Sequence, residues 1–166
     1  MSGGGGGGHT VSDMPNLQYL YLQDNEIAEL EPGELGNLPS LKRLYLSNNK
    51  IAKLKTGTVS DMPNLQSLYL SHNEIAELEP GWVTNVPNLY ELSLSNNKIA
   101  KLANGTVSDM ANLQILHLQD NEIAELEPGW VTNVPSLSSL YLHNNPGAPF
   151  ACSNVSSTFT LSLIHI

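Results

Sequence analysis

Tyrosine is the residue type whose spacing most directly suggests a function. The chain has 6 tyrosines among its 166 residues, and four of them share one column of a regular repeat. These four are Tyr21, Tyr45, Tyr69 and Tyr141. Tyrosine gives a binding surface a large contact area and a polar tip at a low cost in side-chain entropy. The column therefore predicts a partner-binding surface; the alternative is that tyrosine simply suits strands and cross-strand pairing.

The residues around this column point to a protein as the partner. Lys42 and Arg43 are followed by Glu91, so the surface is nearly neutral although the whole chain carries a formal charge of −9. The two most similar units, 65–88 and 113–136, differ mainly on this surface. A surface of mixed polarity fits a protein better than a polyanion. The predicted partner-binding residues are Tyr19, Tyr21, Arg43, Tyr45, Tyr69, Tyr90, Glu91, Ile115, His117 and Tyr141.

The other chemically active residues are not arranged for catalysis or metal binding. His72, His117 and His143 lack metal-ligand spacing, and the single cysteine, Cys152, excludes a multi-cysteine zinc site. Asp120 and His143 could approach each other across neighbouring strands, but no motif places a nucleophilic serine beside them. We therefore predict no catalytic residue, no metal site and no cofactor, and we do not expect an enzyme.

The composition excludes two further classes of partner. Lys and Arg together number 7 against 16 for Asp and Glu, which disfavours attraction to nucleic acid or to anionic lipid. No apolar run approaches the roughly 18 residues that a membrane span requires. Neither nucleic-acid binding nor membrane insertion is expected.

A repeat must position these residues. The pattern LxxLxL recurs at a constant 24-residue step, starting at Leu17, Leu41, Leu65, Leu89, Leu113 and Leu137. Its alternation predicts a short strand with one buried face. One unit cannot bury its leucines alone, whereas units stacked about 4.8 Å apart form a parallel sheet along one side of a solenoid.

Two further columns are predicted to be structural. An asparagine follows each predicted strand, where a buried amide can bond backbone groups that the turning chain leaves unpaired. These residues are Asn25, Asn49, Asn73, Asn97, Asn121 and Asn145. The glycine column suits a tight turn with positive φ. It consists of Gly33, Gly57, Gly81, Gly105 and Gly129.

These columns together resemble the leucine-rich repeat family, in particular the 24-residue type common in extracellular proteins. The resemblance covers about residues 9–145. It implies an α/β-type solenoid: an arc with a concave parallel β-sheet and short irregular or 3₁₀ segments on the convex side. It also implies a non-catalytic module that binds a protein through the concave face, outside the cell or at the cell surface. The rival is a structural matrix or scaffold protein that uses the repeats as a spacer.

The chain departs from that type on the side opposite the strands. The family usually has Phe two residues after the glycine, where this chain has Leu35, Val59, Val83, Val107 and Val131. Trp82 and Trp130 come one residue earlier. We expect them to pack over this lighter spine from outside; an exposed aromatic contact site is the alternative.

Charges on the same side alternate from one unit to the next, so that their pattern repeats with every second unit. One column is Glu26, Lys50, Glu74, Lys98 and Glu122, and another is Glu29, Lys53, Glu77, Lys101 and Glu125. Stacking places each acid beside a base, whereas a slip by one unit would set like charges together. The alternation is therefore predicted to fix the register of the stack.

The predicted domains follow the repeat. Residues 1–8 are a Gly-rich disordered leader, because no strand precedes their glycines and no helix pattern follows. Residues 9–145 are the array, with a partial repeat, five full repeats and the start of a sixth. Because it begins in mid-unit, we expect the chain to be a fragment.

The C-terminal part is divided into two segments. Residues 146–160 resemble an incomplete cysteine-containing flank of extracellular family members. Residues 161–166, LSLIHI, match the translation of a sequencing adapter and are interpreted as an artefact, with a native hydrophobic strand as the alternative. Asn104 and Asn154 begin glycosylation sequons, which would fit a secreted glycoprotein.

Overall fold

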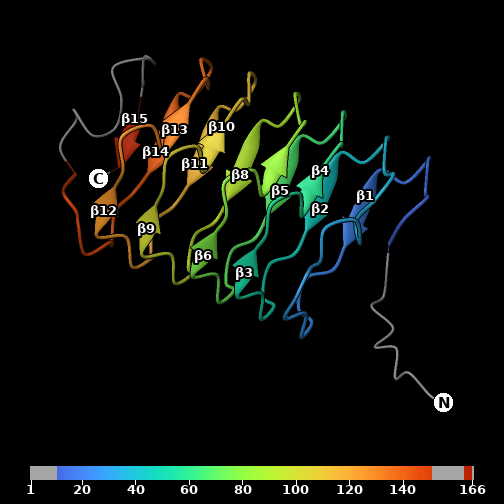
Figure 1. Ribbon diagram of the computed structural model, residues 1–166, viewed down its shortest axis with the longest axis horizontal. Coiled ribbons are helices and arrows are strands. Elements are labelled where there is room, and N and C mark those ends of the chain that lie inside the picture. The colour runs from blue at the N-terminus through green and yellow to red at the C-terminus, as the bar shows by residue number, and fades with distance from the viewer. Residues whose placement is uncertain (1–10, 151–162, 166) are drawn as a thin grey trace.

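The fold is a row of stacked coils, as Figure 1 shows for a computed structural model. The structure describes residues 11–150 and, for the backbone, residues 163–165. The predictions for residues 1–8 and 151–160 and for Asn154 therefore lie outside the described residues.

One strand from each coil joins a parallel sheet of seven strands, in the order β1-β2-β5-β8-β11-β14-β15. Each pairing joins equivalent residues of successive coils, such as Tyr21 with Tyr45 and Tyr45 with Tyr69. The strands are β1 (Tyr19–Tyr21), β2 (Arg43–Tyr45), β5 (Ser67–Tyr69), β8 (Glu91–Ser93), β11 (Ile115–His117), β14 (Ser139–Tyr141) and β15 (Leu163–His165). The predicted solenoid with a parallel sheet is confirmed.

The opposite side is built partly from very short strands. Pairs form between β3 (Lys53–Leu54) and β6 (Glu77–Leu78), β9 (Lys101–Leu102) and β12 (Glu125–Leu126), β4 (Val59–Ser60) and β7 (Val83–Thr84), and β10 (Val107–Ser108) and β13 (Val131–Thr132). Within residues 11–150 the short convex segments are irregular or extended, and none is 3₁₀. Extended backbone in one coil pairs with the same backbone in the next, because every coil has the same length.

The repeated leucines fill one continuous core between the two sides. Leu44, Leu68, Leu92 and Leu116 are fully buried at the centre of their strands. Trp82 is 0% exposed, and its indole Nε1 donates a hydrogen bond to the carbonyl oxygen of Thr106 at 3.1 Å. Trp130 is buried in the same way. The tryptophans therefore pack, as expected, but inside the core and not over it from outside.

The asparagine column bonds each turn to its neighbour. Asn97 Nδ2 donates to the carbonyls of Leu70 and Leu94, at 3.0 and 3.1 Å, and Asn97 Oδ1 accepts from the backbone N–H of Ile75 at 3.0 Å. The same pattern recurs at Asn49, Asn73, Asn121 and Asn145. Each amide thereby satisfies backbone groups that the turning chain would otherwise bury unpaired.

Left-handed backbone recurs at three places in the coil. The predicted positive φ is confirmed for the glycine column, as at Gly57 with φ 81°. Two further columns with positive φ hold Asn or Asp in every coil except at His72. Asn and Asp tolerate this conformation better than other residues with a Cβ. The amides then bond the neighbouring carboxylates: Asn37 to Asp13, Asn85 to Asp61, Asn133 to Asp109, Asn48 to Asp24 and Asn144 to Asp120.

The last strand extends the sheet by one further step of the repeat. β15 pairs with β14, so that Ser139 lies opposite Leu163 and Leu140 opposite Ile164. In the sequence, Leu161, Ile164 and Ile166 continue the LxxLxL pattern at the same 24-residue step. The assignment of residues 161–166 to an artefact or to a native terminal strand stays a prediction.

Candidate partner-binding face

The tyrosine column forms a stack on the solvent side of the long sheet. The rings of Tyr21 and Tyr45 lie 4.7 Å apart at 9°, and those of Tyr45 and Tyr69 lie 5.1 Å apart at 19°. Parallel pairing in register puts these side chains on adjacent strands, at the spacing that aromatic stacking requires. Tyr21 is 61% exposed, so the stack ends in water at β1. We call this solvent side of the seven-stranded sheet the tyrosine face.

A second aromatic pair lies further along the same column. His117 and Tyr141 are stacked at 4.7 Å, and the ring of Tyr141 meets that of His143 edge-on at 6.5 Å. Between the two stacks the column holds Ser93, which is buried. The tyrosine face therefore brings the predicted aromatic residues into two groups and not into one uninterrupted ladder.

Glu91 spans the gap above Ser93. Its Oε2 accepts a hydrogen bond from the hydroxyl of Tyr69 at 3.0 Å, and its Oε1 lies 3.3 Å from Nε2 of His117. Burial of Tyr69, together with the neighbouring Glu91 carboxylate, raises the pKa of the Tyr69 phenol. Glu91 thereby links the two aromatic groups through polar contacts.

Arg43 and Tyr19 flank the first stack. The guanidinium carbon of Arg43 lies 5.9 Å from the centre of the Tyr19 ring, within the range of a cation–π contact. A side-chain hydrogen bond with Tyr45 raises the pKa of Arg43, which stays fully charged. The tyrosine face thus has a basic residue, Arg43, on β2 and an acidic residue, Glu91, on β8.

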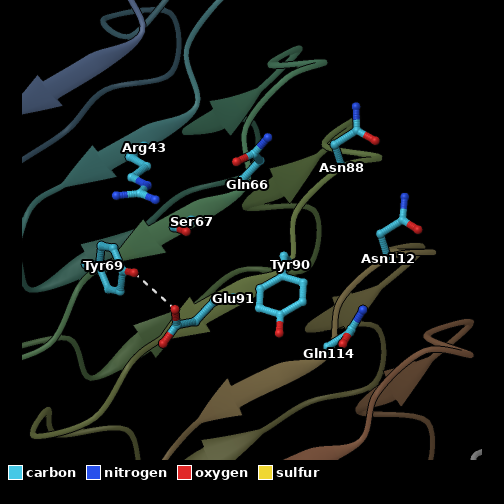
Figure 2. Close-up of a pocket in the computed structure, with 9 residues that line it drawn as sticks. All are labelled: Arg43, Gln66, Ser67, Tyr69, Asn88, Tyr90, Glu91, Asn112 and Gln114. Atoms are coloured by element: carbon cyan, nitrogen blue, oxygen red, sulfur yellow. Dashed lines mark hydrogen bonds between the residues drawn. The ribbon is translucent and has the colours of Figure 1, made fainter.

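A hollow of about 600 Å³ opens between these charges, over β5 and β8 (Figure 2). Its lining consists of Arg43, Gln66, Ser67, Tyr69, Asn88, Tyr90, Glu91, Asn112 and Gln114. Four of these residues, Arg43, Tyr69, Tyr90 and Glu91, belong to the predicted binding set. The serine and the amides were missed, although the sequence does show a small Ser67 between Arg43 and Glu91 in one column.

The remaining predicted residues occupy different surroundings. Tyr90 is 42% exposed at the rim of the hollow, whereas Ile115 is half-buried on β11 beyond Glu91. Asn104 is exposed on the opposite side of the coil, and its backbone N–H bonds Glu127 Oε2 at 3.1 Å. Asn25 is exposed in the first coil, unlike the buried asparagines that follow it.

Asp120 and His143 lie on neighbouring coils. The carboxylate of Asp120 accepts a hydrogen bond from Asn144 Nδ2 at 2.9 Å, and the bond from Asp120 to His143 joins backbone atoms. Within the described residues, no group of three or more His, Cys, Asp or Glu side chains is placed to hold a metal ion. The part of the chain that the structure describes contains no helix that is long and apolar enough to cross a membrane.

Comparison with known proteins assigns the family. The family model described as "Leucine rich repeat" matches residues 7–51, 39–99 and 87–146, which together cover most of the chain. The chain belongs to the leucine-rich repeat family. No curated protein matches this leucine-rich repeat chain by sequence.

Solved structures of leucine-rich repeat proteins resemble the fold. TLR13, in its complex with ssRNA13, is 30% identical over 75% of this chain with a TM-score of 0.70. The match covers 18% of the TLR13 chain. Human 5T4, also called Wnt-activated inhibitory factor 1 or trophoblast glycoprotein, is 23% identical over 78% of this chain and 60% of its own, with a TM-score of 0.51. The chain therefore spans only part of the length of either protein.

Proposed function

We propose that this leucine-rich repeat chain is a non-catalytic recognition module that binds a protein through the tyrosine face. The aromatic stack of Tyr21, Tyr45 and Tyr69 on the solvent side of the sheet carries the proposal; Tyr21 is exposed, and Tyr45 and Tyr69 are half-buried. Stacking holds the rings in place before a partner arrives, so binding costs little further side-chain entropy. Arg43 and Glu91 add fixed charges of opposite sign at the edges of the hollow, which can orient a partner.

A protein is the partner class that the charges favour. The chain carries a formal charge of −9, and the tyrosine face has both Arg43 and Glu91. Binding to a phosphate backbone depends mainly on clustered Lys and Arg, which an acidic chain of this kind lacks. The complex of TLR13 with ssRNA13 nevertheless makes single-stranded RNA the appropriate competing ligand in a test.

The rival function is that of a structural spacer. Ring stacking at 4.7–5.1 Å also stabilises the sheet, at about 0.5–1.5 kcal/mol for each aromatic pair. If the chain is a spacer, the tyrosines matter for stability alone. The two functions therefore predict different effects of removing the same rings.

We also propose that the chain acts outside the cell or at the cell surface. The 24-residue repeat type supports this location, and so does the exposed sequon at Asn104 on the side opposite the tyrosine face. A glycan at Asn104 would leave the stacked tyrosines free to bind. Neither the partner-binding residues nor the glycosylation site needs a cofactor.

The test combines a binding and a stability measurement on the full chain. Random 12-residue peptides displayed on phage are selected on the wild-type chain, and the best binders are titrated onto wild type and Tyr45→Ala/Tyr69→Ala. We expect at least a tenfold loss of affinity in the double variant, with Tm lowered by only a few degrees. A Glu29→Ala variant, changed on the opposite side, should bind like wild type.

The opposite result would favour the spacer. If Tyr45→Ala/Tyr69→Ala binds the peptides as well as wild type and only its Tm falls, recognition through the tyrosine face is wrong. A single-stranded RNA oligonucleotide titrated in the same assay should show no saturable binding. Saturable binding of RNA that depends on Tyr45 and Tyr69 would instead change the partner class.

A further inference from the structure

The hollow exists because one column on the tyrosine face changes abruptly in size. Neighbouring strands place Arg43, Ser67 and Glu91 side by side in register. Ser67 is 8% exposed and too short to fill the space between its two longer neighbours. Tyr69 and Tyr90 also line the hollow, and Figure 2 shows them on either side of the row formed by Arg43, Ser67 and Glu91. With strands about 4.8 Å apart, Arg43 and Glu91 originate from strands roughly 10 Å apart, which leaves room for one side chain.

The two charged residues that line the hollow, Arg43 and Glu91, differ in the side-chain partners that they already have within the protein. The chain has 7 Lys and Arg residues, all within residues 11–150. Five of them form ion pairs with glutamates on the side opposite the tyrosine face: Lys50, Lys53, Lys55, Lys98 and Lys101. Lys42 and Arg43 alone have no carboxylate partner in the described part of the chain. Both are on the tyrosine face, and Arg43 lines the hollow.

Glu91 is, by contrast, already engaged. The hydroxyl of Tyr69 and Nε2 of His117 occupy its two oxygens, and its side chain is only 24% exposed. A basic ligand group would have to compete with both contacts. Arg43 is an exposed residue whose side chain bonds Tyr45 but no carboxylate, and its guanidinium has further N–H donors that can bind the carboxylate of an acidic ligand group through two parallel hydrogen bonds.

We propose that the hollow over Ser67 is the subsite for an acidic side chain of the protein partner, held by Arg43. This rests on the proposed function, because it names the group that the tyrosine face selects. The ring of Tyr90, 42% exposed, covers the methylene part of that side chain. Glu91 repels the carboxylate from the far end of the hollow and so directs it to Arg43.

Amides complete the lining of this subsite. Asn88 Nδ2 and Asn112 Nδ2 donate to the carbonyls of Pro63 and Pro87, at 2.7 and 2.8 Å. These bonds hold the two asparagines in place at the rim. Gln66 and Gln114 offer further amide groups to the polar atoms of a bound segment.

The test uses the same phage-displayed library of random 12-residue peptides. Peptides selected on the wild-type chain should be enriched in Asp and Glu. Titrated as synthetic peptides, they should bind the Arg43→Glu variant at least tenfold more weakly than wild type. The Arg43→Lys variant should lose part of the affinity, because a lysine cannot form the bidentate pair with a carboxylate. Lys98→Glu has the same change in net charge on the opposite side and should bind within about twofold of wild type.

A parallel selection on Arg43→Glu should enrich Lys and Arg in place of Asp and Glu. The acidic subsite is wrong if wild-type binders show no acidic enrichment or if Arg43→Glu binds them normally. If Tyr45→Ala/Tyr69→Ala weakens binding in that case, the tyrosine face remains the binding surface and only the subsite is overturned. If the library contains no binder of wild type at all, both proposals fail.

Discussion

Asn97 and Asn25 occupy the same position in the repeat but differ in what surrounds them. Asn97 is buried and bonds backbone groups of two coils, whereas Asn25 is exposed in the first coil and donates only to the carbonyls of Leu22 and Gln23. A buried polar group left without its partner costs about 1–3 kcal/mol. The asparagine side chain is therefore expected to contribute more to the stability of the fold at position 97 than at position 25.

Asn97→Ala should accordingly lower the free energy of unfolding by about 2–4 kcal/mol, because it leaves several buried backbone groups unpaired. Asn25→Ala should cost less than about 1 kcal/mol, because water can replace its bonds. Urea unfolding followed by circular dichroism measures both. Equal losses in the two variants would show that burial does not decide the contribution of this column.

Ion pairs link the coils on the side opposite the tyrosine face. Lys53 Nζ contacts Glu77, in its own column, at 3.0 Å. It also contacts Glu79 at 2.8 Å, and Glu79 belongs to a further column with Glu31 and Lys55. The hydrogen bond from Lys53, with further bonds from Thr56, lowers the pKa of Glu79 from its usual 4.5 to about 2. A carboxyl whose pKa is lowered in the folded state stabilises the fold above its unfolded pKa and loses that contribution as the pH falls.

The stability that Glu79 contributes should therefore be present above about pH 4.5 and disappear as the pH falls towards 2. Lys53→Met should bring the carboxyl titration of Glu79, followed by NMR, back towards its usual range. Lys42→Met removes the same charge from the tyrosine face, where it has no glutamate partner, and should leave that titration in place. A Glu79 titration that Lys53→Met does not move would contradict the ion-pair geometry.

Across the whole molecule, charges and amides repeat every two coils. Lys coils alternate with Glu coils, and Asp61 accepts a hydrogen bond from Asn85 just as Asp109 does from Asn133. Removing one coil would place Asp61 beside Asp109, whereas removing two would place it beside Asn133. The stack is therefore a row of coil pairs, although the leucine pattern repeats with every single coil.

Deleting residues 65–88 should give a chain whose Tm rises with added salt, because Lys53 then faces Lys101 and salt screens their repulsion. Deleting residues 65–112 sets Lys53 against Glu125, so Tm should stay level or fall with salt. Thermal unfolding between about 20 mM and 500 mM NaCl compares the sign of the two slopes. The sign separates electrostatics from the core that each deletion removes, and identical slopes would exclude a two-coil register.

The sequence alone predicted the features of the fold that follow from comparing equivalent positions of successive repeats. The stack, the parallel sheet and the buried leucines follow from a constant repeat length without insertions. The sequence did not predict two details of the side opposite the sheet. Residues 11–150 contain no 3₁₀ segment, and the tryptophans pack inside the core. A pattern of residue types does not specify how each coil fills its interior. The tyrosine column and its interruption at Ser93 and His117 are visible in the sequence, whereas the stacking of His117 on Tyr141 and the contacts of Glu91 are not.

The sequence by itself determined which residues lie next to each other from coil to coil, because a constant repeat makes equivalent positions neighbours on adjacent strands. Only the tertiary structure decided how side chains from different columns meet. Glu91 reaches Tyr69 and His117 across the short Ser93, and the small Ser67 leaves a hollow beside Arg43, which has no carboxylate partner in the described part of the chain. Such contacts depend on the lengths and directions of side chains in three dimensions, which periodicity in one dimension does not contain.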